Sequence, residues 1–163
     1  MVVILADVGG GAEWLASLSV TKVLLSLHVL AAIVAVGPVT VAASMFPAAL
    51  RAGRTEHLVV LHRICRVYAA VGIAVPLFGF ATASALGVLG DAWLITSIVL
   101  TAAAAAVLVF QVLPGQEKLL APPDGSVMTR VRTRLAMQTG VFNLLWATVT
   151  VLMIVRPGST TGV

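Results

Sequence analysis

Four long windows of the sequence contain no aspartate, glutamate, lysine or arginine, and this feature constrains the fold most. The windows are residues 23–50, 67–90, 92–116 and 135–155. A run of about 20 apolar residues can cross the hydrocarbon core of a bilayer as one helix. We therefore expect an all-α, polytopic membrane protein, a four-transmembrane-helix bundle that forms a single domain over residues 1–163. The expected spans lie at about 23–46, 67–89, 93–113 and 135–155.

The composition agrees with lipid as the main solvent. Hydrophobic residues make up 60% of the chain and charged residues only 10%, whereas about a quarter of the residues of a soluble domain are charged. The net charge is +4, but eight of the ten lysines and arginines lie in segments 47–66 and 117–134, which flank spans. Such basic segments face the cytoplasm. We expect the N-terminus and the C-terminus outside, and no nucleic-acid partner.

Local signals predict where the helices begin, bend and end. Residues 1–22 are expected to be a short tail, because the three glycines at 9–11 should break a helix there. Thr55 marks the start of the second helix, and Pro76 should bend it. Pro114, which Gly115 follows, should end the third helix.

His28 is the only ionisable residue in the first span and the main candidate for function. Ionisable side chains inside a membrane are costly and mark functional sites. Small residues follow at helical spacing, so His28 shares the face that packs against other helices; they are Ala31, Ala32, Ala35 and Ala42. Three roles stay open: a structural hydrogen bond between helices, ligation of haem or a metal, and a proton or substrate path.

Polar and small side chains on the other spans predict the inward faces. Counted at ~1.5 Å per residue, Ser84, Ser97 and Thr150 reach the depth of His28 and are expected to surround its imidazole as a polar cluster. Asn143 lies deeper and is expected to bond across helices. The expected inward rows are Gly72, Gly79, Ala83 and Gly87 on the second span, Ser97, Thr101, Ala104, Leu108 and Gln111 on the third, and Ala136, Thr139, Gly140, Asn143, Ala147 and Thr150 on the fourth.

Other reactive side chains have simpler interpretations. Cys65 is expected to pack as a small apolar residue. His57 and His62 are expected at the interface, near anionic headgroups. Met153 is a candidate second haem ligand, but a methionine there is more typically a core or lipid-facing residue. The sequence has no phosphate loop, no HExxH pair and no nucleophile elbow, so we assign no catalytic residue and no metal ligand and lean against an enzyme.

The opening of the first span, Lys22-Val-Leu-Leu-Ser-Leu-His28-Val-Leu-Ala-Ala, resembles a family of bacterial four-helix membrane proteins, domain of unknown function 2269. Trp93 and the segment from Gln111 to Lys118 are also similar to it, and the resemblance covers most of residues 20–156. That family is distantly similar to copper-resistance D-type proteins and to haem-binding membrane protoporphyrinogen oxidases, which carry a histidine in an early helix. The resemblance implies a bacterial plasma-membrane protein and His28 as a haem ligand.

Taken together, the sequence favours a non-enzymatic accessory or assembly component of a membrane. Its expected partners are the lipid bilayer and either another membrane protein or a second copy of the chain. The spans carry no charged residue, which argues against an ion or proton pump. The alternative is a haem-binding redox or haem-handling protein with His28 as ligand. A weaker alternative is a small-molecule transporter, which would require oligomerisation because four helices leave little room for a path.

Overall fold

The computed structural model describes the backbone of residues 3–120 and 125–158, and the side chains of residues 19–120 and 129–158. The chain is helical throughout these ranges apart from short turns, and no strand occurs in them, so the expected all-α fold is confirmed. The elements are α1 (Val3–Arg51), α2 (Thr55–Val71), α3 (Ala74–Leu86), α4 (Ala92–Val107), the π-helical segment η1 (Leu108–Val112), α5 (Leu113–Leu120) and α6 (Gly125–Val155).

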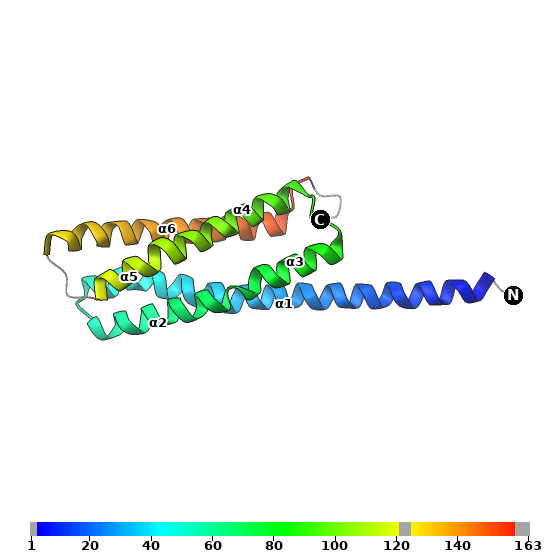
Figure 1. Ribbon diagram of the computed structural model, residues 1–163, viewed down its shortest axis with the longest axis horizontal. Helices are drawn as coiled ribbons and strands as arrows, with labels where there is room; N and C mark the ends of the chain where they lie inside the picture. The colour runs from blue at the N-terminus through cyan, green and yellow to red at the C-terminus, as the bar shows by residue number, and fades with distance from the viewer. Residues whose placement is uncertain (1–2, 121–124, 159–163) are drawn as a thin grey trace.

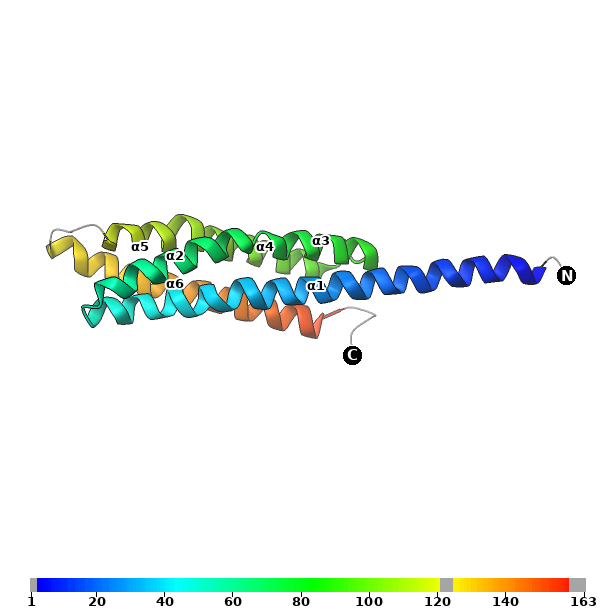
Figure 2. The same cartoon turned by 90° about the horizontal axis from the view of Figure 1, so that it is seen from below.

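These elements line up as four rods, each long and apolar enough to cross a membrane. Within the described residues the rods are Ser19–Arg51, Thr55–Leu86, Ala92–Leu120 and Thr129–Val155. The first rod packs mainly against α2 and α3, and α4 packs mainly against α6 (Figures 1 and 2). Contacts of α1 with α6 and of α2 with α5 join the two halves. The prediction of a four-span bundle is confirmed.

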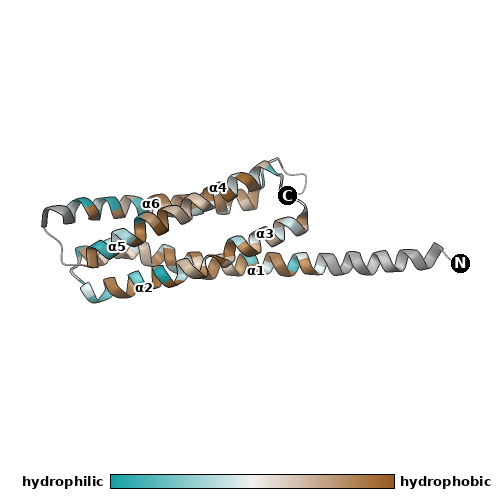
Figure 3. Cartoon of the chain, in the orientation of Figure 1, coloured by the Kyte–Doolittle hydropathy of each residue, from teal (hydrophilic) through white to brown (hydrophobic). Residues whose placement is uncertain are grey.

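Large apolar side chains cover the outside of the bundle. Phe110, Leu144 and Ile154 are 76%, 69% and 73% exposed, which is costly in water but natural against lipid tails. Hydrophilic residues gather at one end, where α2 begins and α5 ends (Figure 3). Inside, Phe46 and Phe142 are fully buried in the main core. The distribution is that of a multi-pass membrane protein.

The first helix begins earlier than the sequence predicts. It runs unbroken from Val3 to Arg51, through the glycines at 9–11, so the expected break at those glycines is wrong. Glycine costs about 1 kcal/mol relative to alanine in a helix but does not clash with helical geometry. The N-terminal part of α1 therefore projects beyond the other helices, on the side where α6 ends (Figure 1).

Glycines in the left-handed region end α1 and α3. Gly53 has φ 67°, its N–H donates to Leu50 O, and the Arg54 N–H donates to Ala49 O. Gly87 has φ 69°, and the same pair of hydrogen bonds closes α3. This Schellman geometry favours glycine because a Cβ is strained there. Gly87 was expected in a packing row of the second span, but it serves as a helix stop.

The second rod is interrupted close to Pro76, and the expected bend is confirmed. Pro76 has no N–H to bond the carbonyl of Gly72, four residues earlier. The Val75 N–H donates to that oxygen instead, over 3.1 Å, and this tighter turn separates α2 from α3. Thr55 begins α2, as the sequence predicts.

The third rod continues past Pro114, so the predicted stop at that residue is wrong. The helix runs on to Leu120 through η1, a π-helical turn that ends immediately before α5. The Leu113 N–H donates to Leu108 O, five residues back. The wider π turn absorbs the misfit that a proline imposes on the preceding turn of an α-helix.

The expected inward rows of the third and fourth rods are partly right. On α4 and η1, Ser97, Ala104 and Leu108 are buried and Thr101 is half-buried, but Gln111 is exposed. On α6 only Thr139 is buried and Asn143 is half-buried. The other four residues of that row are exposed: Ala136, Gly140, Ala147 and Thr150. Larger residues, spaced seven positions apart, fill the interior instead: Leu135, Phe142 and Val149.

Candidate functional site

His28 forms a hydrogen bond between two helices. Its Nδ1 lies 3.0 Å from the backbone oxygen of Val75 on α3, and the side chain is half-buried. The ring also packs against Gly79, one turn further along α3, where an added Cβ would lie 3.0 Å from Cε1. The prediction that the face with His28 packs against another helix is therefore confirmed, and Gly79 provides the room.

This hydrogen bond fixes which ring nitrogen of His28 carries the proton. A carbonyl oxygen only accepts, so Nδ1 must donate to Val75 O. In the neutral ring Nε2 is then unprotonated and keeps its lone pair. Histidines that ligate metals commonly have this arrangement, with the other nitrogen donating to a backbone carbonyl. His28 thus has the tautomer that a haem or metal ligand needs.

The polar cluster expected around His28 is not assembled by hydrogen bonds in the described residues. The Ser97 hydroxyl donates to Trp93 O and the Thr150 hydroxyl to Trp146 O, each on its own helix. Ser84 is exposed and lies five residues beyond Gly79, about 7.5 Å further along α3. In the structure His28 contacts Val75 and Gly79 of α3 instead.

Asn143 bonds across helices, as the sequence predicts. Its Nδ2 donates to the Ser44 hydroxyl on α1 over 2.9 Å. Three polar atoms on neighbouring turns of α6 are buried without a hydrogen-bond partner: Thr139 Oγ1, Asn143 Oδ1 and Trp146 Nε1. This face of α6 is the least satisfied polar region among the described side chains.

A second polar group, formed by His62, Cys65 and Gln116, joins α1, α2 and α5. His62 Nδ1 lies 3.1 Å from Gln116 Oε1, and Gln116 Nε2 donates to Cys65 Sγ over 3.5 Å. The Cys65 thiol in turn faces Val39 O at 4.0 Å. Gln116 and Cys65 are fully buried. We call this the His62–Gln116–Cys65 chain.

The sequence reasoning missed this chain. Cys65 was expected to act only as an apolar residue and His62 only as an interfacial one, and Gln116 was not singled out. The available signal was the spacing of three between His62 and Cys65, which puts both on one face of a helix. The register of Gln116 depends on α5 continuing past Pro114, which the sequence did not predict.

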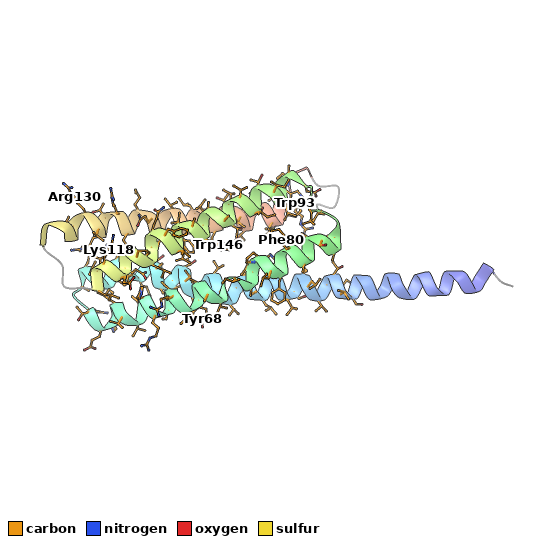
Figure 4. All side chains as sticks on the ribbon, in the orientation of Figure 1. Tyr68, Phe80, Trp93, Lys118, Arg130 and Trp146 are labelled. Carbon is orange, nitrogen blue, oxygen red and sulfur yellow. The ribbon has the colours of Figure 1, made fainter. Side chains whose placement is uncertain are left out.

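At the opposite end of the bundle, Trp93 connects the start of α4 to the end of α6 (Figure 4). Its Nε1 donates to Asp91 Oδ2 over 2.9 Å, and the Arg156 guanidinium lies 5.4 Å from its ring centroid. Met153 packs against an apolar cluster formed by Ala83, Trp93 and Leu94, so it has the core role that is typical of methionine. His57 is exposed on α2, at the basic end.

No group of three or more His, Cys, Asp or Glu side chains that could hold a metal ion occurs among the described residues. Comparison of the chain with protein-family models, curated proteins and solved structures finds no match. The resemblance of residues 20–156 to bacterial four-helix membrane proteins therefore stays a prediction.

Proposed function

We propose that this protein is a non-enzymatic accessory or assembly component of a bacterial plasma membrane, and that it binds a transmembrane helix of another membrane protein. One observation carries the proposal: small residues on the outer faces of α4 and α6 are exposed. They are Ala102, Ala105 and Ala106 on α4, and Ala136, Gly140 and Ala147 on α6.

Exposed small residues in a span are suited to close helix packing. Ala136 and Gly140 are four residues apart, and an added Cβ at Gly140 would meet no atom within 4 Å. Small residues at this spacing let a second helix approach closely, which increases van der Waals contact in lipid. Met137 and Leu144 flank the glycine on the same outer face and are also exposed, so they would pack along the sides of such a helix.

The basic end of the bundle supports an orientation for this partner role. Arg51, Arg54 and Lys118 lie at the end where α1 meets α2 and α5 ends, and all three are exposed. By the positive-inside rule this end faces the cytoplasm, and the N-terminus and the C-terminus lie outside. Reporter fusions at Gly53 and at the C-terminus test the orientation.

The partner role is tested by gentle detergent extraction from native membranes, followed by native mass spectrometry of the intact complex. We expect a stoichiometric membrane protein with the wild type, and its loss with Gly140→Leu, which blocks close approach. Val151→Leu is the matched control, because Val151 is exposed on the same face of α6 but is already bulky. A complex that survives Gly140→Leu unchanged, or wild-type protein that is only monomeric, contradicts the proposal.

The second candidate is a haem-binding redox or haem-handling protein with His28 as ligand. It is favoured by the hydrogen bond from Nδ1 to Val75 O, which leaves Nε2 free to ligate. His28 would hold the iron, and Val75 would keep the ring in orientation. The haem would supply redox chemistry or be carried as cargo.

Absorption spectra of the purified protein, oxidised and reduced, separate this candidate from the partner role. A Soret band with near-stoichiometric pyridine haemochrome, lost in His28→Ala and kept in His57→Ala, supports haem binding. His57 is the control because it is exposed at the basic end. A featureless spectrum from folded wild-type protein rules the haem candidate out.

A further inference from the structure

We propose that a hollow on the outer face of α2 binds the phosphate headgroup of an anionic phospholipid. The hollow has a volume of about 480 Å³ and is lined by Val59, His62, Arg63, Arg66 and Val67. The last four follow Val59 by three, four, seven and eight positions, so all five share one face of the helix. The proposal requires only that the chain lies in a membrane, and it goes beyond the partner role.

A buried amide orients the histidine of this hollow. Gln116 Nε2 donates to the sulfur of Cys65, whose thiol faces Val39 O. Gln116 then presents Oε1 to the ring, and His62 Nδ1 must donate to it. The remaining ring atom, Nε2, is the one available to a ligand. Gln116 is a positioning residue, held rigidly because it is fully buried.

The two arginines of the hollow are uncompensated. Arg63 and Arg66 are exposed, and no acidic side chain among the described residues forms an ion pair with either. Guanidinium groups bind phosphate through two parallel N–H donors, and Nε2 of His62 adds a further donor whenever both ring nitrogens carry a hydrogen. The hollow therefore suits an oxyanion with several acceptor oxygens.

The position of the hollow favours a lipid over a free phosphate. Arg66 immediately precedes the charge-free window that begins at Val67, so its guanidinium lies where headgroup phosphates meet the apolar layer. Val67 and Val71 are one helical turn apart and both exposed. They continue the hollow as an apolar ridge toward the membrane centre, along which an acyl chain can lie.

Competitive lipid binding to the purified full-length protein, measured by native mass spectrometry, tests the proposal. The probes are phosphatidylglycerol and phosphatidylcholine, which differ in net headgroup charge. We expect the wild type to retain phosphatidylglycerol preferentially, and Arg63→Gln/Arg66→Gln to bind it about tenfold or more weakly, since each basic side chain near the surface contributes appreciably.

The matched control is Arg130→Gln/Arg134→Gln, which removes the same charge from exposed arginines of α6 at the same end. Binding within twofold of the wild type is expected there. An equal loss in both double variants means a general charge effect and overturns the site, and so does a wild type without lipid preference. Circular dichroism confirms that each variant is helical.

Two further arms address the source of the phosphate and the role of Gln116. Inorganic phosphate at millimolar concentration should leave bound phosphatidylglycerol in place, and displacement would assign the hollow to a free anion instead. Gln116→Leu keeps the net charge but releases His62. We expect about threefold weaker phosphatidylglycerol binding with phosphatidylcholine binding unchanged, and an equal loss for both lipids would overturn the positioning role.

Discussion

The imidazole of His28 on α1 lies against Gly79 on α3, so closely that a Cβ at position 79 would come within 3.0 Å of Cε1 and 3.2 Å of Nδ1. The same ring donates to Val75 O, one turn before the glycine. The missing side chain at position 79 and the hydrogen bond at position 75 depend on each other, because the ring can reach the carbonyl only where the two helices approach closely.

Gly79→Ala is expected to destabilise the protein. The added methyl group would displace the ring of His28 and lengthen its bond to Val75 O, at a cost of about 1–3 kcal/mol for overpacking. Thermal unfolding of the purified protein in detergent measures this as a lower Tm. Gly140→Ala is the matched control, because a Cβ at Gly140 meets nothing within 4 Å. Equal Tm values for the two variants would contradict the close packing.

Gln116→Leu is expected to destabilise the fold through its two partners. It leaves the His62 Nδ1–H and the Cys65 sulfur without the amide, and unpaired buried groups cost about 1–3 kcal/mol. A double-mutant cycle with His62→Leu should show a coupling energy of about 0.5 kcal/mol or more.

Gln111→Leu controls for the loss of an amide from the same rod, since Gln111 is exposed, and its effect should stay within about 0.5 kcal/mol. Additive single effects in the cycle would mean that His62 and Gln116 do not interact.

Two buried threonines should respond differently to the isosteric change to valine. Thr139 Oγ1 has no hydrogen-bond partner, whereas the Thr82 hydroxyl donates to Phe78 O over 2.7 Å. Thr139→Val removes a buried unsatisfied hydroxyl and should raise stability by up to about 1 kcal/mol. Thr82→Val should be neutral or slightly destabilising. If Thr139→Val is the more destabilising of the two, a bound water or ligand must satisfy that hydroxyl.

Much of the architecture followed from charge-free windows, because a bilayer leaves few alternatives to a helix in a long apolar run. The number of spans was predictable for that reason, and local helix signals predicted the start of α2 at Thr55 and the bend near Pro76. The wrong predictions concerned helix-breaking residues, glycine and proline, whose effect on a helix depends on the surrounding structure. Glycines at 9–11 reduce helix propensity without preventing a helix, and the π turn before Pro114 compensates for the proline.

The site was harder to predict than the spans, because it depends on register between helices. The face of His28 could be read from small residues at helical spacing, but its partners Val75 and Gly79 could not. Small residues on α6 were assigned to the interior, yet Phe142 fills it. Sequence periodicity identifies two faces of a membrane helix. It does not say which face is buried, because apolar residues are stable both in the bundle core and against lipid.

Trp93 and Arg156 should stabilise the end of the bundle opposite the basic one. Trp93 is buried and Arg156 half-buried, with the guanidinium 5.4 Å from the ring centroid. Cation–π pairs of this kind contribute about 0.5–2 kcal/mol. Arg156→Gln should therefore lower the Tm, and Trp93→Leu/Arg156→Gln should show positive coupling, because either change alone removes the pair. Arg130→Gln, an exposed arginine at the other end of α6, should leave the Tm unchanged. A Tm for Arg156→Gln equal to that of Arg130→Gln would mean that the docking of α6 on α4 relies on Met153 and its apolar neighbours alone.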